Sequence, residues 1–249
     1  MASREEMSTS FGAAADTYET GRPSYPAEAV AWMLQPVRGA GRSLRVADVG
    51  AGTGKLTRAI VEHGAEVVAI DPDAGMLENL RANVAGVPTF VGRAESLPLP
   101  DAAVDAVLLG QAWHWVDVPA ASAEAARVLR AGGVLGLVWN VRDERTPWVR
   151  RMTEAMHGSH AEEMMAGGGP TVAAPFDGLE DRTWRWTRPM SRDDLFAMTR
   201  SRSYVLTAEP AERARIEQGL AVVCDEIGAV GDAVVDLPYV TRAFRSIRP

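Results

Sequence analysis

The sequence has almost no cysteine, no long apolar run and no apolar start. Cys224 is the only cysteine, which excludes an intrachain disulfide and a cysteine-cluster metal site and suits a reducing compartment. The first ten residues, MASREEMSTS, are polar, and no apolar run approaches the ~18 residues needed to cross a bilayer. We therefore expect a cytoplasmic protein, with Cys224 buried as a small hydrophobic residue.

Lysine is scarce as well, and acidic residues outnumber basic ones, 33 to 26. The formal net charge is -7, and Lys55 is the only lysine. Without a basic surface, neither a nucleic-acid backbone nor an anionic membrane is expected as the main partner. The composition favours a small-molecule partner instead.

Apolar stretches that alternate with amphipathic ones occupy the first part of the chain. We predict strands over 43–50, 65–72, 87–95, 103–111 and 132–140, and helices over 55–64, 73–84 and 119–133. Strands that are apolar throughout and separated by helices are typical of a parallel sheet covered on both faces. The predicted fold class is therefore α/β, doubly wound, and 249 residues suit a single domain of this kind.

The second part of the chain is less regular. Its pattern predicts helices over 147–158, 191–205 and 210–228, and strands over 182–189 and 234–247. Methionines are frequent here, and two roles stay open for them: an adaptable pocket wall or filling of the core. They stand at positions 152, 156, 164, 165, 190 and 198.

A glycine-rich loop, VGAGTGKL, joins the first predicted strand to the first helix. It is not a phosphate-binding P-loop, because three residues rather than four separate Gly50 from Gly54-Lys55, and Leu56 follows. The dinucleotide fingerprint needs glycine or alanine where Lys55 stands, which weakens that interpretation. Glycines without side chains before the start of a helix still predict that a ligand can approach the backbone closely.

Asp71 ends the second predicted strand, 21 residues after Gly50. A carboxylate at this place can accept hydrogen bonds from both hydroxyls of a ribose, so we expect the ligand to contain a nucleoside. The alternative for Asp71 is a cap of the following helix, a role that Asp73 could equally fill.

Four segments together carry a family resemblance: VADVGAGTGKLTRAI, VVAIDPDAGML, VGRAESLPLPDAAVDAVLLGQAWHW and AARVLRAGGVLGLVWN. In order and spacing they resemble the motifs of class I S-adenosylmethionine-dependent methyltransferases. They are most similar to the small-molecule branch that includes the ubiquinone/menaquinone-biosynthesis and trans-aconitate enzymes, the latter through the HW after the fourth strand. The resemblance implies a mostly parallel seven-stranded Rossmann-like sheet in one domain, with a cap segment (1–40), a cofactor-binding core (41–140) and a specificity region (141–249).

The resemblance also implies a cofactor site for S-adenosyl-L-methionine. Three glycines would line its methionine part, Asp48 would order the loop or meet the amino group, and Asp71 would hold the ribose. Met76 would lie near the adenine, with Ala94 and Glu95 at the adenine edge, although Glu95 could instead be a solvated loop carboxylate. The expected cofactor contacts are Arg22, Asp48, Gly50, Gly52, Gly54, Asp71, Met76, Ala94, Glu95 and Gln111.

The N-terminal segment FGAAADTYETGRPSYP resembles the part of the family that folds over the cofactor. Arg22 would then meet the methionine carboxylate, and Tyr18 would lie near the sulfonium or the acceptor as a catalytic residue. Tyr25 is expected among the substrate-binding residues. Without the resemblance, Tyr18 and Arg22 would be ordinary surface residues.

The stretch GQAWHWVD follows the fourth predicted strand, at the edge of the sheet where ligands bind. Trp113, Trp115 and Trp139 could line the acceptor site or fill the core. For His114 three roles stay open: a general base, a group that orients an already ionised acceptor, or a tie within the loop. The other histidines lie in unrelated elements, so no metal is expected.

The function expected from these features is transfer of a methyl group from S-adenosylmethionine to a small organic acceptor. Oxygen of a carboxylate, phenol or enol is the preferred nucleophile, with nitrogen or carbon as alternatives. Two other functions stay open: a non-catalytic cofactor-binding protein or partner subunit, and an NAD(P)-dependent oxidoreductase, which Lys55 disfavours.

Overall fold

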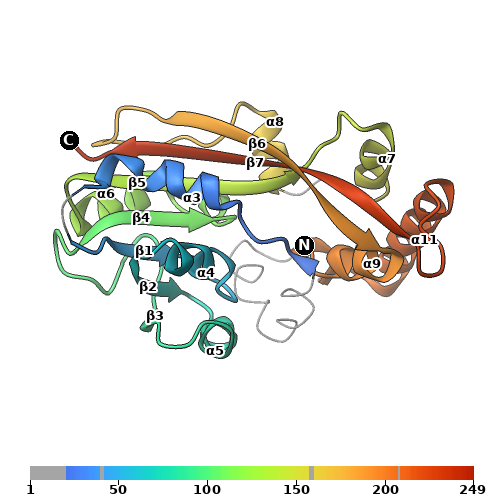
Figure 1. The fold of residues 1–249 in the computed structure, drawn as a ribbon, viewed down its shortest axis with the longest axis horizontal. Helices are drawn as coiled ribbons and strands as arrows, with labels where there is room; N and C mark the ends of the chain where they lie inside the picture. The colour runs from blue at the N-terminus through green and yellow to red at the C-terminus, as the bar shows by residue number, and fades with distance from the viewer. Residues whose placement is uncertain (1–20, 40–41, 157–159, 207) are drawn as a thin grey trace.

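A computed structural model of the protein describes residues 21–39, 42–156, 160–206 and 208–249. Within them, seven strands form one sheet in the order β3-β2-β1-β4-β5-β7-β6 (Figure 1). The strands are β1 (Arg45–Val49), β2 (Glu66–Asp71), β3 (Thr89–Val91), β4 (Val104–Gly110), β5 (Leu129–Arg142), β6 (Glu180–Ser191) and β7 (Val234–Ile247). The first five run parallel, and β7 runs antiparallel to β5 and β6. The α/β fold expected from the sequence is confirmed.

Helices cover both faces of the parallel part of the sheet, as its apolar strands require. The helices are α3 (Ala27–Leu34), η2 (Gln35–Val37), α4 (Lys55–Glu62), α5 (Ala74–Asn83), η3 (Trp113–Trp115), α6 (Val118–Val128), α7 (Pro147–Met156), α8 (His160–Ala166), α9 (Arg192–Arg200), α10 (Ser203–Leu206) and α11 (Pro210–Glu226). No helix in the described ranges is both long and apolar enough to cross a membrane.

Alternate residues of the strands divide between two cores. Val46 and Leu108 pack with α3 and α4 on one face, whereas Ala47 and Leu109 pack with α6 on the other. This is the side-chain period of two that extended strands impose. Because these strands are parallel neighbours, their carboxyl ends lie along one edge of the sheet, where the loops that follow β1, β2, β4 and β5 begin.

A further core lies beyond the parallel strands, where β6 and β7 extend to α9 and α11 (Figure 1). Four of the methionines are fully buried in it: Met152, Met156, Met190 and Met198. Cys224 is buried there too, as expected. Core filling is therefore the role of these four methionines.

Three predicted elements differ clearly from those in the structure. The helix expected over 119–133 ends at Val128, because Leu129 has extended backbone and begins β5 opposite Val104. The strand expected over 87–95 is only three residues long, because the chain turns at an Arg93–Ser96 bridge. The helix expected over 191–205 is divided into α9 and α10.

Candidate functional site

The glycine-rich loop lies between β1 and α4, and its three glycines have left-handed backbone, with φ of 69°, 55° and 92° at Gly50, Gly52 and Gly54. A Cβ at Gly50 would lie 2.6 Å from the Ala112 Cβ, and one at Gly54 would lie 2.9 Å from Leu80 Cγ. At Gly52 no described atom lies within 4 Å of that position. Gly54 is thus required for packing against α5, while Gly52 leaves its surroundings open to a ligand.

Asp71 closes β2 beside this loop and is only 6% exposed. Its Oδ2 accepts a hydrogen bond from Gly52 N at 2.9 Å, and its Oδ1 accepts one from Asp73 N at 2.8 Å. Burial raises the pKa of Asp71 to about 6, although these two hydrogen bonds lower it. The cap of α5 is Asp73, which accepts from Gly75 N and Met76 N, so Asp71 is not the helix cap.

Asp48 lies in β1 under the same loop and is fully buried. Its Oδ2 accepts a hydrogen bond from the Thr57 hydroxyl of α4 at 2.5 Å, which fastens the helix to the strand. Its Oδ1 has no hydrogen-bond partner among the described residues. Burial raises the pKa of Asp48 to about 7, and the charge of Asp71 adds to the rise. Two buried carboxyl groups of raised pKa here favour a ligand that brings hydrogen-bond donors or positive charge.

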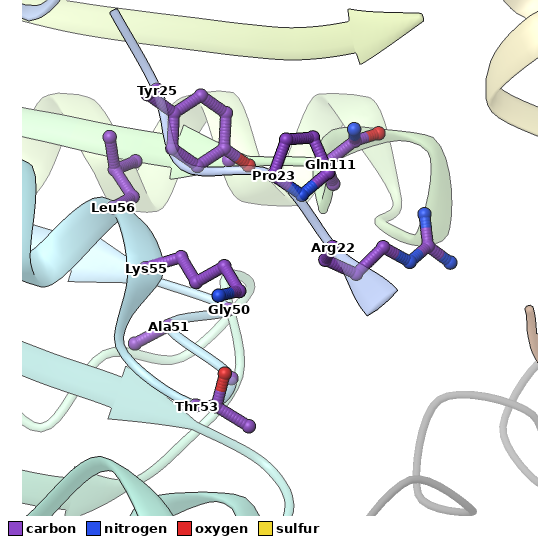
Figure 2. A pocket seen from close by; sticks show the side chains of 11 residues that line it. Arg22, Pro23, Tyr25, Gly50, Ala51, Thr53, Lys55, Leu56 and Gln111 are labelled. Carbon is purple, nitrogen blue, oxygen red and sulfur yellow. The ribbon is translucent and has the colours of Figure 1, made fainter. Parts of the chain in front are cut away.

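The N-terminal segment 21–25 lies over the loop (Figure 2). Arg188 Nη1 donates to the Gly21 carbonyl at 3.2 Å and Asn140 Nδ2 to the Ser24 carbonyl at 3.0 Å. Between segment and loop lies a cavity of about 30 Å³, room for only one or two waters. It is lined by Arg22, Pro23, Tyr25, Gly50, Ala51, Gly52, Thr53, Lys55, Leu56, Gly110 and Gln111.

The side chains of the segment point in different directions. Tyr25 packs against the end of β4, where a Cβ at Gly110 would be 2.6 Å from its hydroxyl. The Arg22 guanidinium points away from the glycine loop (Figure 2), and its Nη2 donates to the Ser201 carbonyl at 3.5 Å. A wider cavity of about 470 Å³ is lined by the same segment together with Lys55, Trp186 and Arg188. Tyr18 lies outside the described residues.

Gln111 follows β4 and has left-handed backbone, with φ of 56°, which is rare for a residue with a side chain. Its N–H donates to the Val138 carbonyl, and its Nε2 donates to the Asn140 carbonyl at 2.9 Å. These bonds to β5 hold Gln111 at the wall of the cavity. Backbone outliers of this kind concentrate at functional sites.

The three tryptophans of the predicted acceptor wall differ in their surroundings. Trp113 is 2% exposed and donates from Nε1 to the Thr171 carbonyl at 2.8 Å. Trp139 is fully buried and packs edge-on against Phe244. These two rings thus fill the core rather than form an exposed wall, because both belong to the buried cluster between the sheet and α6. Trp115 is partly exposed, and its ring lies 4.8 Å from that of His114.

His114 is held by one of these core rings. Trp139 Nε1 donates to His114 Nδ1 at 3.3 Å. An indole N–H can only donate, so Nδ1 must accept, and the proton of a neutral His114 must therefore be on Nε2. The imidazole is thus fixed as a hydrogen-bond donor through Nε2.

The loop after β3 is tied to α6. Glu95 Oε1 accepts from Asp117 N at 2.8 Å, and Asp117 caps α6 by accepting from Ala120 N. Ala94 packs against the core between the sheet and α6. Glu95 is therefore bonded to the start of α6, whereas the alternative expected only a solvated loop carboxylate. Met76 is 3% exposed near the start of α5, and its N–H donates to Asp73 Oδ1 at 3.3 Å.

Asn140 is the residue at this site that the sequence analysis passed over. It ends the continuous buried stretch 133–140 of β5. Its Nδ2 donates to the Ser24 carbonyl, its Oδ1 accepts from the Thr241 hydroxyl at 2.6 Å, and its backbone carbonyl accepts from Gln111. Its signal in the sequence is a lone amide after a run of apolar residues. In the described parts of the chain, no group of three or more His, Cys, Asp or Glu could hold a metal.

Comparison with known proteins gives consistent results. Residues 47–137 match the family described as methyltransferase domain. An uncharacterised methyltransferase of Mycobacterium tuberculosis is 45% identical over 98% of both chains. A malonyl-[acyl-carrier protein] O-methyltransferase of Serratia marcescens is 43% identical over 35% of both chains. Among solved structures, one named as a type II methyltransferase from Anaeromyxobacter dehalogenans aligns with a TM-score of 0.68 and 26% identity, over 91% of this chain and 97% of the other.

Proposed function

The chain belongs to the class I S-adenosylmethionine-dependent methyltransferases, and from this premise we propose that it methylates a small organic acceptor at an oxygen that is already anionic. Membership of this family argues against the two other functions considered, an NAD(P)-dependent oxidoreductase and a non-catalytic binding protein. The proposal depends on one observation above all: the hydrogen bond from Trp139 to His114 at the ends of β5 and β4.

The residues of the glycine-loop site suit the cofactor. Asp71 would accept from the ribose hydroxyls, and Asp48 offers a buried oxygen without a partner in the described structure to a donor such as the ammonium group. The open position at Gly52 lets backbone approach the methionine part. When bound, the cofactor supplies an electrophilic methyl group on a cationic sulfonium. The two carboxyl groups, with pKa values raised by burial, would ionise more readily beside that positive charge.

His114 would orient the acceptor rather than deprotonate it. Because its Nδ1 accepts from Trp139, its Nε2 carries the proton and donates to an anionic oxygen. An ionised carboxylate, enolate or phenolate needs no base, so this tautomer suits such a nucleophile. The partial match to an O-methyltransferase that acts on a malonyl carrier also supports oxygen as the methylated atom.

The remaining acceleration would come from position and from exclusion of water. Segment 21–25, fastened by Asn140 and Arg188, covers the loop and leaves little free space. Holding nucleophile and methyl in line in a dry site can contribute ~7 to 11 kcal/mol. This is enough for a displacement that needs no metal and no covalent intermediate.

An acceptor screen tests the proposal. The protein is incubated with S-adenosylmethionine and a panel of small carboxylic acids, phenols, enols, amines and thiols, and mass spectrometry detects addition of one methyl group with release of S-adenosylhomocysteine. We expect products from acids, phenols or enols. Transfer only to amines, thiols or carbon would contradict oxygen as the acceptor, and transfer only to macromolecules would contradict a small acceptor.

A further inference from the structure

A cluster of buried polar side chains lies where β5 ends against α8, α9 and α10. Arg142, the last residue of β5, has a fully buried side chain. Glu162 of α8 is 12% exposed, and Arg202, between α9 and α10, is 8% exposed. Tyr204 of α10 completes the group. Charges so deeply buried are costly, and they are kept in proteins where they are paired or serve a function.

The two arginines share one carboxylate oxygen. Arg142 Nη2 lies 2.8 Å from Glu162 Oε1, and Arg202 Nη1 lies 4.0 Å from the same atom. Arg142 is also held by Thr153 Oγ1, to which its Nε donates at 3.2 Å. The Arg142 guanidinium is therefore held in place by the protein before any ligand arrives, and the Arg202 guanidinium lies within ion-pair distance of the same carboxylate.

The hydroxyl of Tyr204 is buried and has no hydrogen-bond partner in the described structure. Leaving such a group unsatisfied destabilises the folded protein, so a native protein rarely does so without a reason. The charges that act on Tyr204 are those of Arg202, Arg142, Glu162 and Arg22. Burial raises the pKa of Tyr204, so the hydroxyl keeps its proton and can donate.

These donors have one chemical character in common. Guanidinium groups only donate hydrogen bonds, and the Tyr204 hydroxyl can donate beside them. An oxyanion is the ligand that accepts from all of them, and arginines pair with carboxylates and phosphates in a fixed geometry.

We propose that Arg142, Arg202 and Tyr204 form a buried site that binds an anionic group, a carboxylate or a phosphate, of the methyl acceptor. This proposal rests on the proposed function and extends it by naming the feature that the acceptor must carry. The site adjoins the cofactor region through Arg22, which lines the cavity at the glycine loop and donates to the Ser201 carbonyl, next to Arg202.

Binding of small probes to the protein saturated with S-adenosylhomocysteine tests this site without requiring turnover. Isothermal titration calorimetry compares succinate and inorganic phosphate with succinamide, the neutral match of succinate. We expect at least one anion to bind roughly tenfold more tightly than the amide. If neither succinate nor phosphate binds more tightly than succinamide, or if neither anion binds at all, the proposal is overturned.

Tyr204→Phe is the most informative variant, because it removes only the hydroxyl. The hydroxyl makes no bond in the described structure, so the ligand-free variant should be as stable as the parent or more so. Its anion affinity should fall roughly tenfold. Tyr239→Phe is the matched control: that buried hydroxyl contacts Met198 Sδ at 3.2 Å, and its loss should leave anion affinity unchanged.

Arg202→Gln should also weaken anion binding by at least about tenfold. Arg200→Gln removes the same charge two residues earlier, where Arg200 pairs with Glu217 at the exposed side of α9, and should change the affinity less than about twofold. Equal effects of the two arginine variants would contradict the site.

The anionic group could also be the carboxylate of the cofactor itself. In that case Tyr204→Phe would weaken S-adenosylhomocysteine binding in the absence of probes, and the assignment to the acceptor would be wrong. If the acceptor screen yields a methylated product that carries no anionic group, the proposed function stands and this site alone fails.

Discussion

Replacement of Asp48 by asparagine should change how the stability of the ligand-free protein depends on pH. Burial raises the pKa of Asp48 from 3.8 to about 7. Between these two values the folded state keeps a proton that the unfolded state has lost. The folded state binds more protons there, so the free energy of unfolding falls as pH rises through this window.

The size of the effect follows from the shift. Each pKa unit corresponds to ~1.4 kcal/mol, so the ionised carboxylate costs ~4 kcal/mol above pH 7. Part of this cost is already present at pH 5, which leaves a decline of ~2 to 3 kcal/mol between about pH 5 and 7.5. Asparagine keeps an oxygen that can accept from Thr57 but carries no charge, so Asp48→Asn should lack this part of the decline.

The measurement is urea unfolding of both proteins at several pH values in that range. The pKa of His63 is lowered by burial, which produces a slope of the opposite sign, but it is present in both proteins and cancels in their difference. Thr57→Val provides a second check: without the hydroxyl that lowers the pKa of Asp48, the decline should move to higher pH. Profiles of parent and Asp48→Asn that run parallel within ~0.5 kcal/mol would refute the reasoning.

Three further outcomes are expected. Asp71→Asn should weaken S-adenosylhomocysteine binding by ~1 to 3 kcal/mol in calorimetry, because a charged hydrogen-bond acceptor is lost; unchanged affinity would remove Asp71 from the ribose site. His114→Gln should lower kcat roughly tenfold with the pH profile and cofactor affinity unchanged, whereas loss of the acidic limb would make His114 a base. Gly54→Ala should lower the free energy of unfolding by ~1 to 3 kcal/mol, since φ is 92° and Leu80 lies 2.9 Å from the added Cβ; equal urea midpoints would contradict this.

The arrangement of the glycine loop and Asp71 in the candidate site could be predicted because its signals are local. Gly50 and Gly52 lie within a strand-loop-helix unit, and Asp71 ends the next strand, so order in the sequence fixes their place at one edge of the sheet. The sequence could not decide which of Asp71 and Asp73 faces the loop and which caps the helix. The answer depends on which carboxylate reaches Gly52 N, a contact between different elements.

The tryptophans show a second limit. Trp113 and Trp139 follow or end strands whose carboxyl ends face a ligand, which favours a site, but both rings turn into the core. Their direction depends on Thr171 and Phe244, residues that come 58 and 105 positions later. Only the assembled structure shows that Trp139 acts on His114 by fixing its tautomer.

The acceptor half carries no motif, because it is built from single residues of distant elements. Arg142 ends β5, Glu162 belongs to α8, and Arg202 and Tyr204 follow α9, so nothing in their spacing brings them together. Each alone would be interpreted as a surface residue, since arginine and glutamate are mostly exposed. What distinguishes them is burial, which the sequence does not state. A buried tyrosine hydroxyl without a partner in the described structure, close to two buried arginines, is therefore a structural signal for a ligand, and the proposal of an anionic group on the acceptor rests on this signal and not on the fold, which many methyltransferases share.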